Sequence, residues 1–123
     1  MRDLKMYILV NKDIEITKAK LSGQTAHASN VLTYRMCKEN DILIDEYMQG
    51  SIKKIILSCS QSKLEELEKL GYVTIRDNGL TELEPNTLTR VTIGILDKDN
   101  IPDELKFVKR LRLLYGEETE WNY

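Results

Sequence analysis

Apolar and polar residues follow one another along the chain in blocks whose spacing predicts a strand and then two helices. The run from Lys5 to Asn11 is continuously apolar at its centre, which is typical of a strand buried on both faces. From about Lys18 through Tyr34, apolar residues recur at helical spacing, and they do so again from Ile42 to Met48. Gly50 is expected to end this second, shorter helix.

The second half of the chain carries the same kind of alternation. Ser62 with Glu65 three residues later forms a capping box, which predicts a helix from Lys63 to Leu70. We expect Leu64, Leu67 and Leu70 to face the core, and Gly71 to end the helix. Apolar and β-branched runs predict three further strands, over residues 52–58, 72–76 and 87–96.

A last helix is expected near the end of the chain. Pro102 suits a helix start, and Asp103 and Glu104 place negative charge in the first turn, where the helix dipole favours it. Lys109 and Arg110 then mark a basic last turn.

The order of these elements indicates the fold class. Strands that alternate with helices favour an open α/β sheet that is at least partly parallel, with helices packed on both faces. Turn signals at Asp77-Asn78-Gly79 and Pro85-Asn86 join two strands, so an antiparallel piece is expected and the sheet is predicted to be mixed. We predict a single four-stranded α/β domain over residues 1–116, followed by a polar tail over residues 117–123.

Composition excludes several classes of protein. A hydrophobic content of 41% with 31% charged residues is ordinary for a globular protein and does not indicate disorder. The longest apolar runs are about five residues, far below the roughly 20 that a membrane helix needs, and no signal-peptide core is present. We therefore expect a cytoplasmic protein without a membrane segment.

Charge and cysteine content narrow the chemistry further. The net charge of −2 gives no global attraction to nucleic acid, although residues 1–38 hold seven basic residues and only three acidic ones. A nucleic-acid surface must therefore be local. Cys37 and Cys59 lack metal-ligand spacing and the chain has one histidine, so reduced thiols are expected and a zinc site is not.

The start of the first helix carries the most distinctive polar pattern. Thr17 can cap the helix, and Lys18 and Lys20 occupy the first turn, where the dipole disfavours positive charge by roughly 0.3–1 kcal/mol per group. Two ammonium groups beside unpaired amides suit an anion such as a phosphate, although both lysines could simply point into water. Lys20, Gln24 and His27 lie at i, i+4 and i+7 and form one polar stripe.

Other candidate positions are less specific by themselves. Ala19, Gly23 and Ala26 form a stripe of small residues, which we expect to pack against the sheet. Asp77 follows a strand, so it is either a turn residue or one of the ligand-facing residues that collect at strand ends. A lone helical histidine such as His27 is more often a packed or solvated residue than a catalyst.

Two blocks of sequence resemble the archaeal- and eukaryotic-type peptidyl-tRNA hydrolases, the second family of these enzymes. The first block is a strand followed by Lys18-x-Lys20-x-x-x-Gln24-x-x-His27-Ala28. The second runs from Ile75-Arg76-Asp77-Asn78-Gly79-Leu80-Thr81 through Pro85-Asn86-Thr87-Leu88-Thr89 to Ile93-Gly94. The resemblance covers about residues 5 to 114 with both blocks in the right order.

The resemblance implies an activity, partners and a site. It implies cleavage of the ester between a peptide and the 3′ ribose of tRNA, with peptidyl-tRNA as the partner, no metal or other cofactor, and a possible homodimer. Carried over residue by residue, it implies a catalytic set of Lys20, His27, Asp77, Thr81 and Thr89, with Lys18 and Gln24 binding substrate.

Roles for these residues follow from what the reaction needs. Asp77 would be the general base or the group that orients water, and Lys20 would stabilise the oxyanion or bind the terminal phosphate. Thr81 and Thr89 would position water or the ribose, and His27 would orient other groups from outside the reacting centre. The whole hypothesis requires that the start of the first helix and the loop after the third strand meet in space.

The chain departs from the family pattern at three loop positions. Leu80 stands where a basic residue is usual, Asn78 replaces an alanine, and Asn86 replaces a glycine. Residues 39–49 are also acidic. These departures keep two alternatives open: a catalytically silent relative that binds RNA or protein, and a plain α/β interaction domain.

Overall fold

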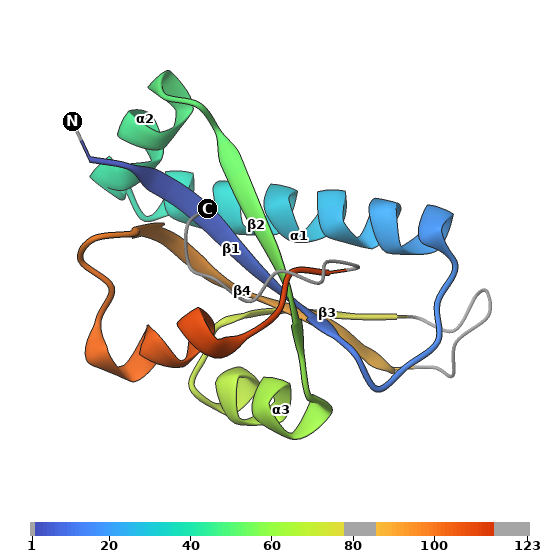
Figure 1. The fold of residues 1–123 in the computed structure, drawn as a ribbon. Coiled ribbons are helices and arrows are strands. Elements are labelled where there is room, and N and C mark those ends of the chain that lie inside the picture. Colours follow the sequence, from blue (N-terminus) through green and yellow to red (C-terminus); the bar gives the residue numbers. More distant parts are fainter. Residues whose placement is uncertain (1, 78–85, 115–123) are drawn as a thin grey trace.

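A four-stranded mixed sheet forms the centre of the protein, in a computed structural model that describes residues 2–77 and 86–114 (Figure 1). The strands lie in the order β2-β1-β4-β3. β1 pairs in parallel with β2, and β4 is antiparallel to both β1 and β3. The strands are β1 (Leu4–Asn11), β2 (Lys53–Cys59), β3 (Val73–Arg76) and β4 (Leu88–Asp97). The predicted mixed α/β sheet is confirmed.

Strand β1 is buried along its whole length, as its continuous apolar pattern predicted. It is flanked by a strand on each side and covered by helices on both faces, so even Lys5 and Asn11 are buried. The Lys5 ammonium reaches the start of β1, where it lies 3.3 Å from Asp3 Oδ2. A long aliphatic stem lets a lysine occupy a buried strand in this way.

Helices cover both faces of the sheet, as expected. The helices α1 (Lys18–Lys38) and α2 (Ile42–Gln49) lie on one face, and α3 (Gln61–Lys69) and the 3₁₀ helix η1 (Asp103–Arg110) lie on the other (Figure 1). Successive β1 side chains alternate between these layers. Met6, Ile8 and Val10 pack with α1 and α2, whereas Tyr7 and Leu9 pack with α3 and η1. Among the described residues, no helix is long and apolar enough to span a membrane.

Local hydrogen bonds explain where the first two helices begin. Thr17 Oγ1 accepts from the backbone amide of Lys20, so the predicted cap is confirmed. Helix α1 continues four residues beyond Tyr34, to Lys38. Asp41 then caps α2 by accepting from the amide of Leu43 at 3.0 Å.

The predictions for α3 were wrong in two details. Ser60, not Ser62, caps the helix, because its hydroxyl accepts from the amide of Lys63 at 3.3 Å. Leu70 is 74% exposed, while Leu64 and Leu67 are buried. A three-residue step falls short of the 3.6-residue turn, so each leucine is rotated roughly 60° from the one before and the third leaves the buried face.

The last helix also differs from the prediction. Residues Asp103–Arg110 form a 3₁₀ helix, and Pro102 precedes it as the cap residue without a side-chain cap hydrogen bond. The acidic first turn and the basic last turn are as expected. The turn residues Asn78 and Gly79 and the tail over residues 117–123 lie outside the described part of the chain.

An irregularity in the pairing of β3 with β4 shapes the face that α1 covers. Ile75 pairs with Arg90 and Arg76 pairs with Leu88, so Thr89 is an extra residue on β4. A bulge of this kind re-aims side chains that would otherwise alternate. Thr89 and Arg90 are neighbours in sequence, yet both contact α1.

Candidate active site

Asp77 lies at the end of β3 with its backbone held in place. Its amide donates to the carbonyl of Thr87 at 2.8 Å, and its carbonyl accepts from the amide of Asn86 at 2.6 Å. Asn86 has φ of 64°, a left-handed conformation that asparagine tolerates better than most residues. These bonds continue the β3–β4 pairing to the residues that flank the segment 78–85.

The Lys20 ammonium lies against the Asp77 carboxylate, with Nζ 2.9 Å from Oδ2. The Asp77 side chain is completely buried, whereas that of Lys20 is 20% exposed. The lysine therefore lies between the carboxylate and solvent. The predicted meeting of the first helix with the end of the third strand is confirmed, and the alternative that both first-turn lysines point into water is wrong for Lys20.

Gln24 and Thr89 complete a small polar cluster around this pair. Gln24 Nε2 lies 3.5 Å from Asp77 Oδ2, and Gln24 Oε1 lies 3.5 Å from the Thr89 hydroxyl. Both are long contacts, near the limit of a hydrogen bond. The Thr89 hydroxyl also donates to the carbonyl of Ile75 at 2.9 Å, and Thr89 is fully buried. We call Lys20, Gln24, Asp77 and Thr89 the Lys20 cluster.

His27 lies apart from the Lys20 cluster, on the exposed side of α1. It lines a shallow hollow of about 560 Å³ together with Gly23, Ala26, Asn30, Val31 and Tyr34. His27 is rotated only about 20° from Lys20 around the helix axis, but it lies seven residues, or about 10 Å, farther along that axis. The polar stripe predicted from spacing is therefore divided, and the catalytic role of His27 stays a prediction.

The stripe of small residues does not pack against the sheet, so that prediction was wrong. Ala19, Gly23 and Ala26 are all exposed. The residues of α1 that face the sheet are larger: Leu21, Thr25, Ala28, Leu32 and Met36. Leucine and methionine side chains bury more apolar area than alanine does, and this decides which face of the helix turns inward.

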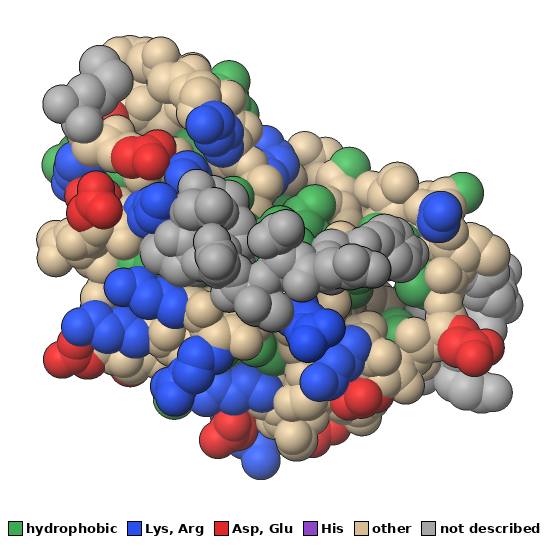
Figure 2. Space-filling view, viewed as in Figure 1, with side chains coloured by type: hydrophobic (Ala, Val, Ile, Leu, Met, Phe, Trp, Pro, Cys, Tyr) green, Lys and Arg blue, Asp and Glu red, His purple; other side chains and the backbone are tan. Residues whose placement is uncertain are grey.

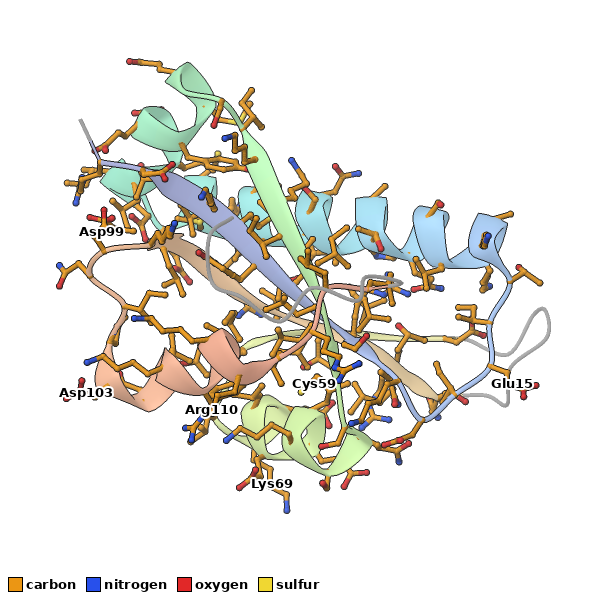
Figure 3. The ribbon with its side chains drawn as sticks, in the orientation of Figure 1. Glu15, Cys59, Lys69, Asp99, Asp103 and Arg110 are labelled. Atoms are coloured by element: carbon orange, nitrogen blue, oxygen red, sulfur yellow. The ribbon has the colours of Figure 1, made fainter. Side chains whose placement is uncertain are left out.

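Lys18 is exposed in the first turn of α1, near the segment marked by Glu15 in Figure 3. Thr81 lies outside the described residues, so its predicted role is untested.

Arg90 contacts the same part of α1, although it is not among the site residues predicted from the sequence. Its Nη1 donates to the Leu21 carbonyl at 3.1 Å and to the Thr25 hydroxyl. Arg90 is completely buried, and burial lowers the pKa of its guanidinium to about 10. An arginine within an otherwise largely apolar strand was the signal in the sequence that could have identified it.

Basic side chains gather over α3 and η1, on the face of the sheet opposite to α1 (Figure 1). Figure 2 shows Lys and Arg over η1 and α3, the elements that carry Arg110 and Lys69 in Figure 3. The cations of η1 and the residues just after it are all exposed: Lys106, Lys109, Arg110 and Arg112. Local positive charge is therefore present on this chain despite its net charge of −2.

The cysteines are free thiols, Cys37 exposed and Cys59 buried. Burial raises the pKa of the Cys59 thiol to about 11. Within residues 2–77 and 86–114, no group of three or more His, Cys, Asp or Glu side chains is arranged to hold a metal ion.

Comparison with known proteins identifies the family. The sequence profile described as "Peptidyl-tRNA hydrolase PTH2" matches residues 4–114. A peptidyl-tRNA hydrolase of Methanopyrus kandleri is 37% identical over 97 residues, which cover 73% of this chain and 83% of the relative. One from Saccharolobus solfataricus is 31% identical over 119 residues, covering 85% and 99%. One from Staphylothermus marinus is 37% identical over 99 residues, covering 75% and 82%. This chain belongs to the PTH2 family of peptidyl-tRNA hydrolases.

Proposed function

We propose that the chain hydrolyses the ester bond of peptidyl-tRNA, releasing peptide and free tRNA, and that the Lys20 cluster carries the reaction. Membership of the PTH2 family supports the reaction class. The observation that supports the site is the 2.9 Å contact between Lys20 Nζ and Asp77 Oδ2. It joins two residues, 57 positions apart in sequence, that come from the two family motifs.

Lys20 acts on the carbonyl oxygen of the ester. When water attacks the carbonyl carbon, negative charge develops on that oxygen, and a fixed cation beside it lowers the barrier. Lys20 is the solvent-facing member of the ion pair, so a substrate carbonyl that approaches from solvent meets its ammonium first. The bond from the carbonyl carbon to the 3′ oxygen of the ribose then breaks, and this oxygen leaves as a hydroxyl group after taking up the proton that Asp77 accepted from the water.

Asp77 acts from the buried side of Lys20. Its carboxylate orients the ammonium and accepts the proton that the attacking water loses, as a general base. Gln24 lies between Asp77 and Thr89, so its amide is held by polar contacts on both sides. Thr89 thus positions Gln24, while Thr81 positions the attacking water.

Three exposed side chains bind the tRNA part of the substrate. Lys18, in the first turn of α1, contacts the phosphate nearest the scissile ester. Arg110 and Arg112 contact phosphates farther along the tRNA, since cations on a local surface supply most of the sequence-independent affinity for nucleic acid. His27 contributes to substrate contact from the hollow beside Gly23 and Tyr34.

The reaction proceeds without a metal ion, in the cytoplasm, where peptidyl-tRNA is produced. The resemblance to the family supports the first statement and the substrate class supports the second. A chelator such as EDTA is therefore expected to leave the turnover number unchanged.

Two copies of the chain assemble through the outer surface of α1 and α2. Large apolar side chains are exposed there, with Tyr34 66%, Ile42 78% and Met48 49% exposed. Sedimentation at several protein concentrations tests for the dimer.

The proposed reaction is tested by incubating purified protein with an N-blocked aminoacyl-tRNA and measuring release of the blocked amino acid. The wild type is expected to cleave it and Asp77→Asn to be nearly inactive. Salt-dependent tRNA binding without cleavage would instead support the alternative of a catalytically silent binding module. Leu80 favours this alternative, because it stands where the family usually carries a basic residue. Absence of both activities would support a plain interaction domain.

A further inference from the structure

Arg90 is unusual because it is a completely buried charged residue whose hydrogen-bonding groups are only partly used. Its Nη1 donates to α1, but neither Nε nor Nη2 has a hydrogen-bond partner among the described residues. Burying a charge is costly unless it is fully paired, and an apolar side chain of similar size often serves stability as well or better. Stability alone therefore does not explain an arginine at this position.

The contacts of Arg90 lie directly beside the residues that contact Asp77. Arg90 binds Leu21 and Thr25, and each of these follows a member of the Lys20 cluster, since Lys20 precedes Leu21 and Gln24 precedes Thr25. Two adjacent residues of β4 therefore contact the same turn of α1: Thr89 contacts Gln24, and Arg90 donates to Leu21 and Thr25. The bulge at Thr89 lets two adjacent residues of one strand reach α1 together.

The Leu21 carbonyl is one point at which Arg90 joins β4 to this turn of α1. It accepts from the Thr25 hydroxyl at 2.9 Å as well as from Arg90 Nη1 at 3.1 Å. A rotation of α1 about its axis would break the contacts of Arg90 and move Lys20 and Gln24 away from Asp77.

We propose that Arg90 is a positioning residue for the reaction: it fixes the turn of α1 that carries Lys20 and Gln24 against β4, so that both side chains face Asp77. Arg90 does not touch the substrate, because it is buried beneath α1. This inference rests on the proposed function, in which Lys20 stabilises the oxyanion.

The test compares Arg90→Met, Arg90→Lys and wild type in cleavage of N-blocked aminoacyl-tRNA. Methionine has a similar length and no charge, so the melting temperature of Arg90→Met is expected to be equal to or higher than that of wild type. Misplacement of reacting groups is expected to lower kcat by about 10- to 100-fold, with KM changed less than about twofold. Arg90→Lys restores part of kcat, because it keeps one charged donor.

Thr92→Val is the matched control. Thr92 is buried on the same strand and the same face, and its hydroxyl also lacks a hydrogen-bond partner among the described residues. It has no contact with the Lys20 cluster in the described part of the chain, so kcat is expected to match wild type. If Arg90→Met fails to fold, Thr25→Val replaces it, since it removes an acceptor of Arg90 while keeping the side-chain volume.

Two kinetic results would overturn the positioning role. One is a wild-type kcat for folded Arg90→Met, or for Thr25→Val where that variant replaces it. The other is full additivity of Arg90→Met with Lys20→Ala, because a residue that acts through Lys20 has little left to affect once Lys20 is gone.

A readout without tRNA separates failure of this inference from failure of the proposed function. Acetylation of Lys20 by an amine-directed reagent, followed by mass spectrometry, is expected to be severalfold faster in Arg90→Met, because the ion pair with Asp77 is loosened. Inactive wild type would refute the proposed function alone. Equal acetylation rates in the two proteins would refute the positioning role, whether or not the wild type is active.

Discussion

Replacement of Asp77 by asparagine tests the ion pair at the centre of the site. Asparagine has nearly the same shape, so it removes the charge without leaving a cavity. At 2.9 Å and an effective dielectric constant of about 20, the gross attraction to Lys20 is roughly 6 kcal/mol. Desolvation of the buried carboxylate offsets most of this, so the net loss of stability is expected to be about 1–3 kcal/mol.

The variant therefore stays folded while losing activity. For a domain of this size, about 3–5 °C of melting temperature is lost per kcal/mol, so a decrease of roughly 3–15 °C is expected. Loss of a general base lowers kcat by about 10²- to 10⁴-fold. Cleavage is measured at 25 °C by release of the blocked amino acid, and circular dichroism at the same temperature confirms that the variant is folded.

Lys20→Met is the companion variant, and the burial of the two partners predicts an asymmetry between them. Lys20 can turn its ammonium to solvent when Asp77 is neutralised, because its side chain is 20% exposed. The Asp77 side chain is completely buried, so its carboxylate stays largely desolvated when the Lys20 charge is removed. Lys20→Met is therefore expected to cost more stability than Asp77→Asn, up to about 3–5 kcal/mol.

Asp99→Asn serves as the control, since Asp99 is exposed near the far end of β4 (Figure 3). Its stability is expected to change by less than about 0.5 kcal/mol, and its kcat should match wild type. An Asp77→Asn variant that cleaves substrate at the wild-type rate would refute the assignment of Asp77. Equal destabilisation by Asp77→Asn and Lys20→Met would refute the burial argument.

Three further predictions concern surfaces and thiols. A double variant Arg110→Glu and Arg112→Glu should bind tRNA more weakly and lower the slope of log affinity against log salt by about 1–2, measured by titration at several salt concentrations. An unchanged slope would exclude these two residues from the tRNA surface. At pH 8, Cys37 should react with maleimide in the native protein and Cys59 should not, because Cys59 is buried and its pKa of about 11 leaves little thiolate. Mass spectrometry distinguishes the two cysteines, and rapid labelling of Cys59 would contradict its burial. His27→Asn should raise KM more than it lowers kcat, whereas a loss confined to kcat would place His27 at the reacting centre.

Much of the fold was predictable from local pattern. The continuous apolar run of β1 predicted a strand buried on both faces, because only a central strand covered by helices hides both sets of alternating side chains. Thr17 identified the start of α1, since a cap depends on hydrogen bonds within one turn. Two details of α3 failed: Ser60 rather than the nearby Ser62 caps the helix, and Leu70 is exposed because steps of three residues turn it away from the buried face.

The candidate site was predictable only as a set of residue types carried over from a family resemblance. Spacing placed Lys20, Gln24 and His27 on one stripe, but His27 lies about 10 Å farther along the helix axis than Lys20. The direction in which α1 faces the sheet brings Lys20 and Gln24 to Asp77. That direction depends on Leu21, Leu32 and the other buried residues of α1, which pack against strands distant in sequence.

The sequence by itself determined the elements and the mixed α/β class, because these depend on periodicity and caps within short stretches. The lysine and the aspartate suited to ester hydrolysis were implied by the family resemblance. Only the tertiary structure decided that the Lys20 ammonium pairs with Asp77, that Thr89 contacts Gln24, and that Arg90 of the bulged strand β4 donates hydrogen bonds to α1. Those contacts span 57 to 69 residues of sequence, and they form only where sheet register and helix orientation have been settled by packing.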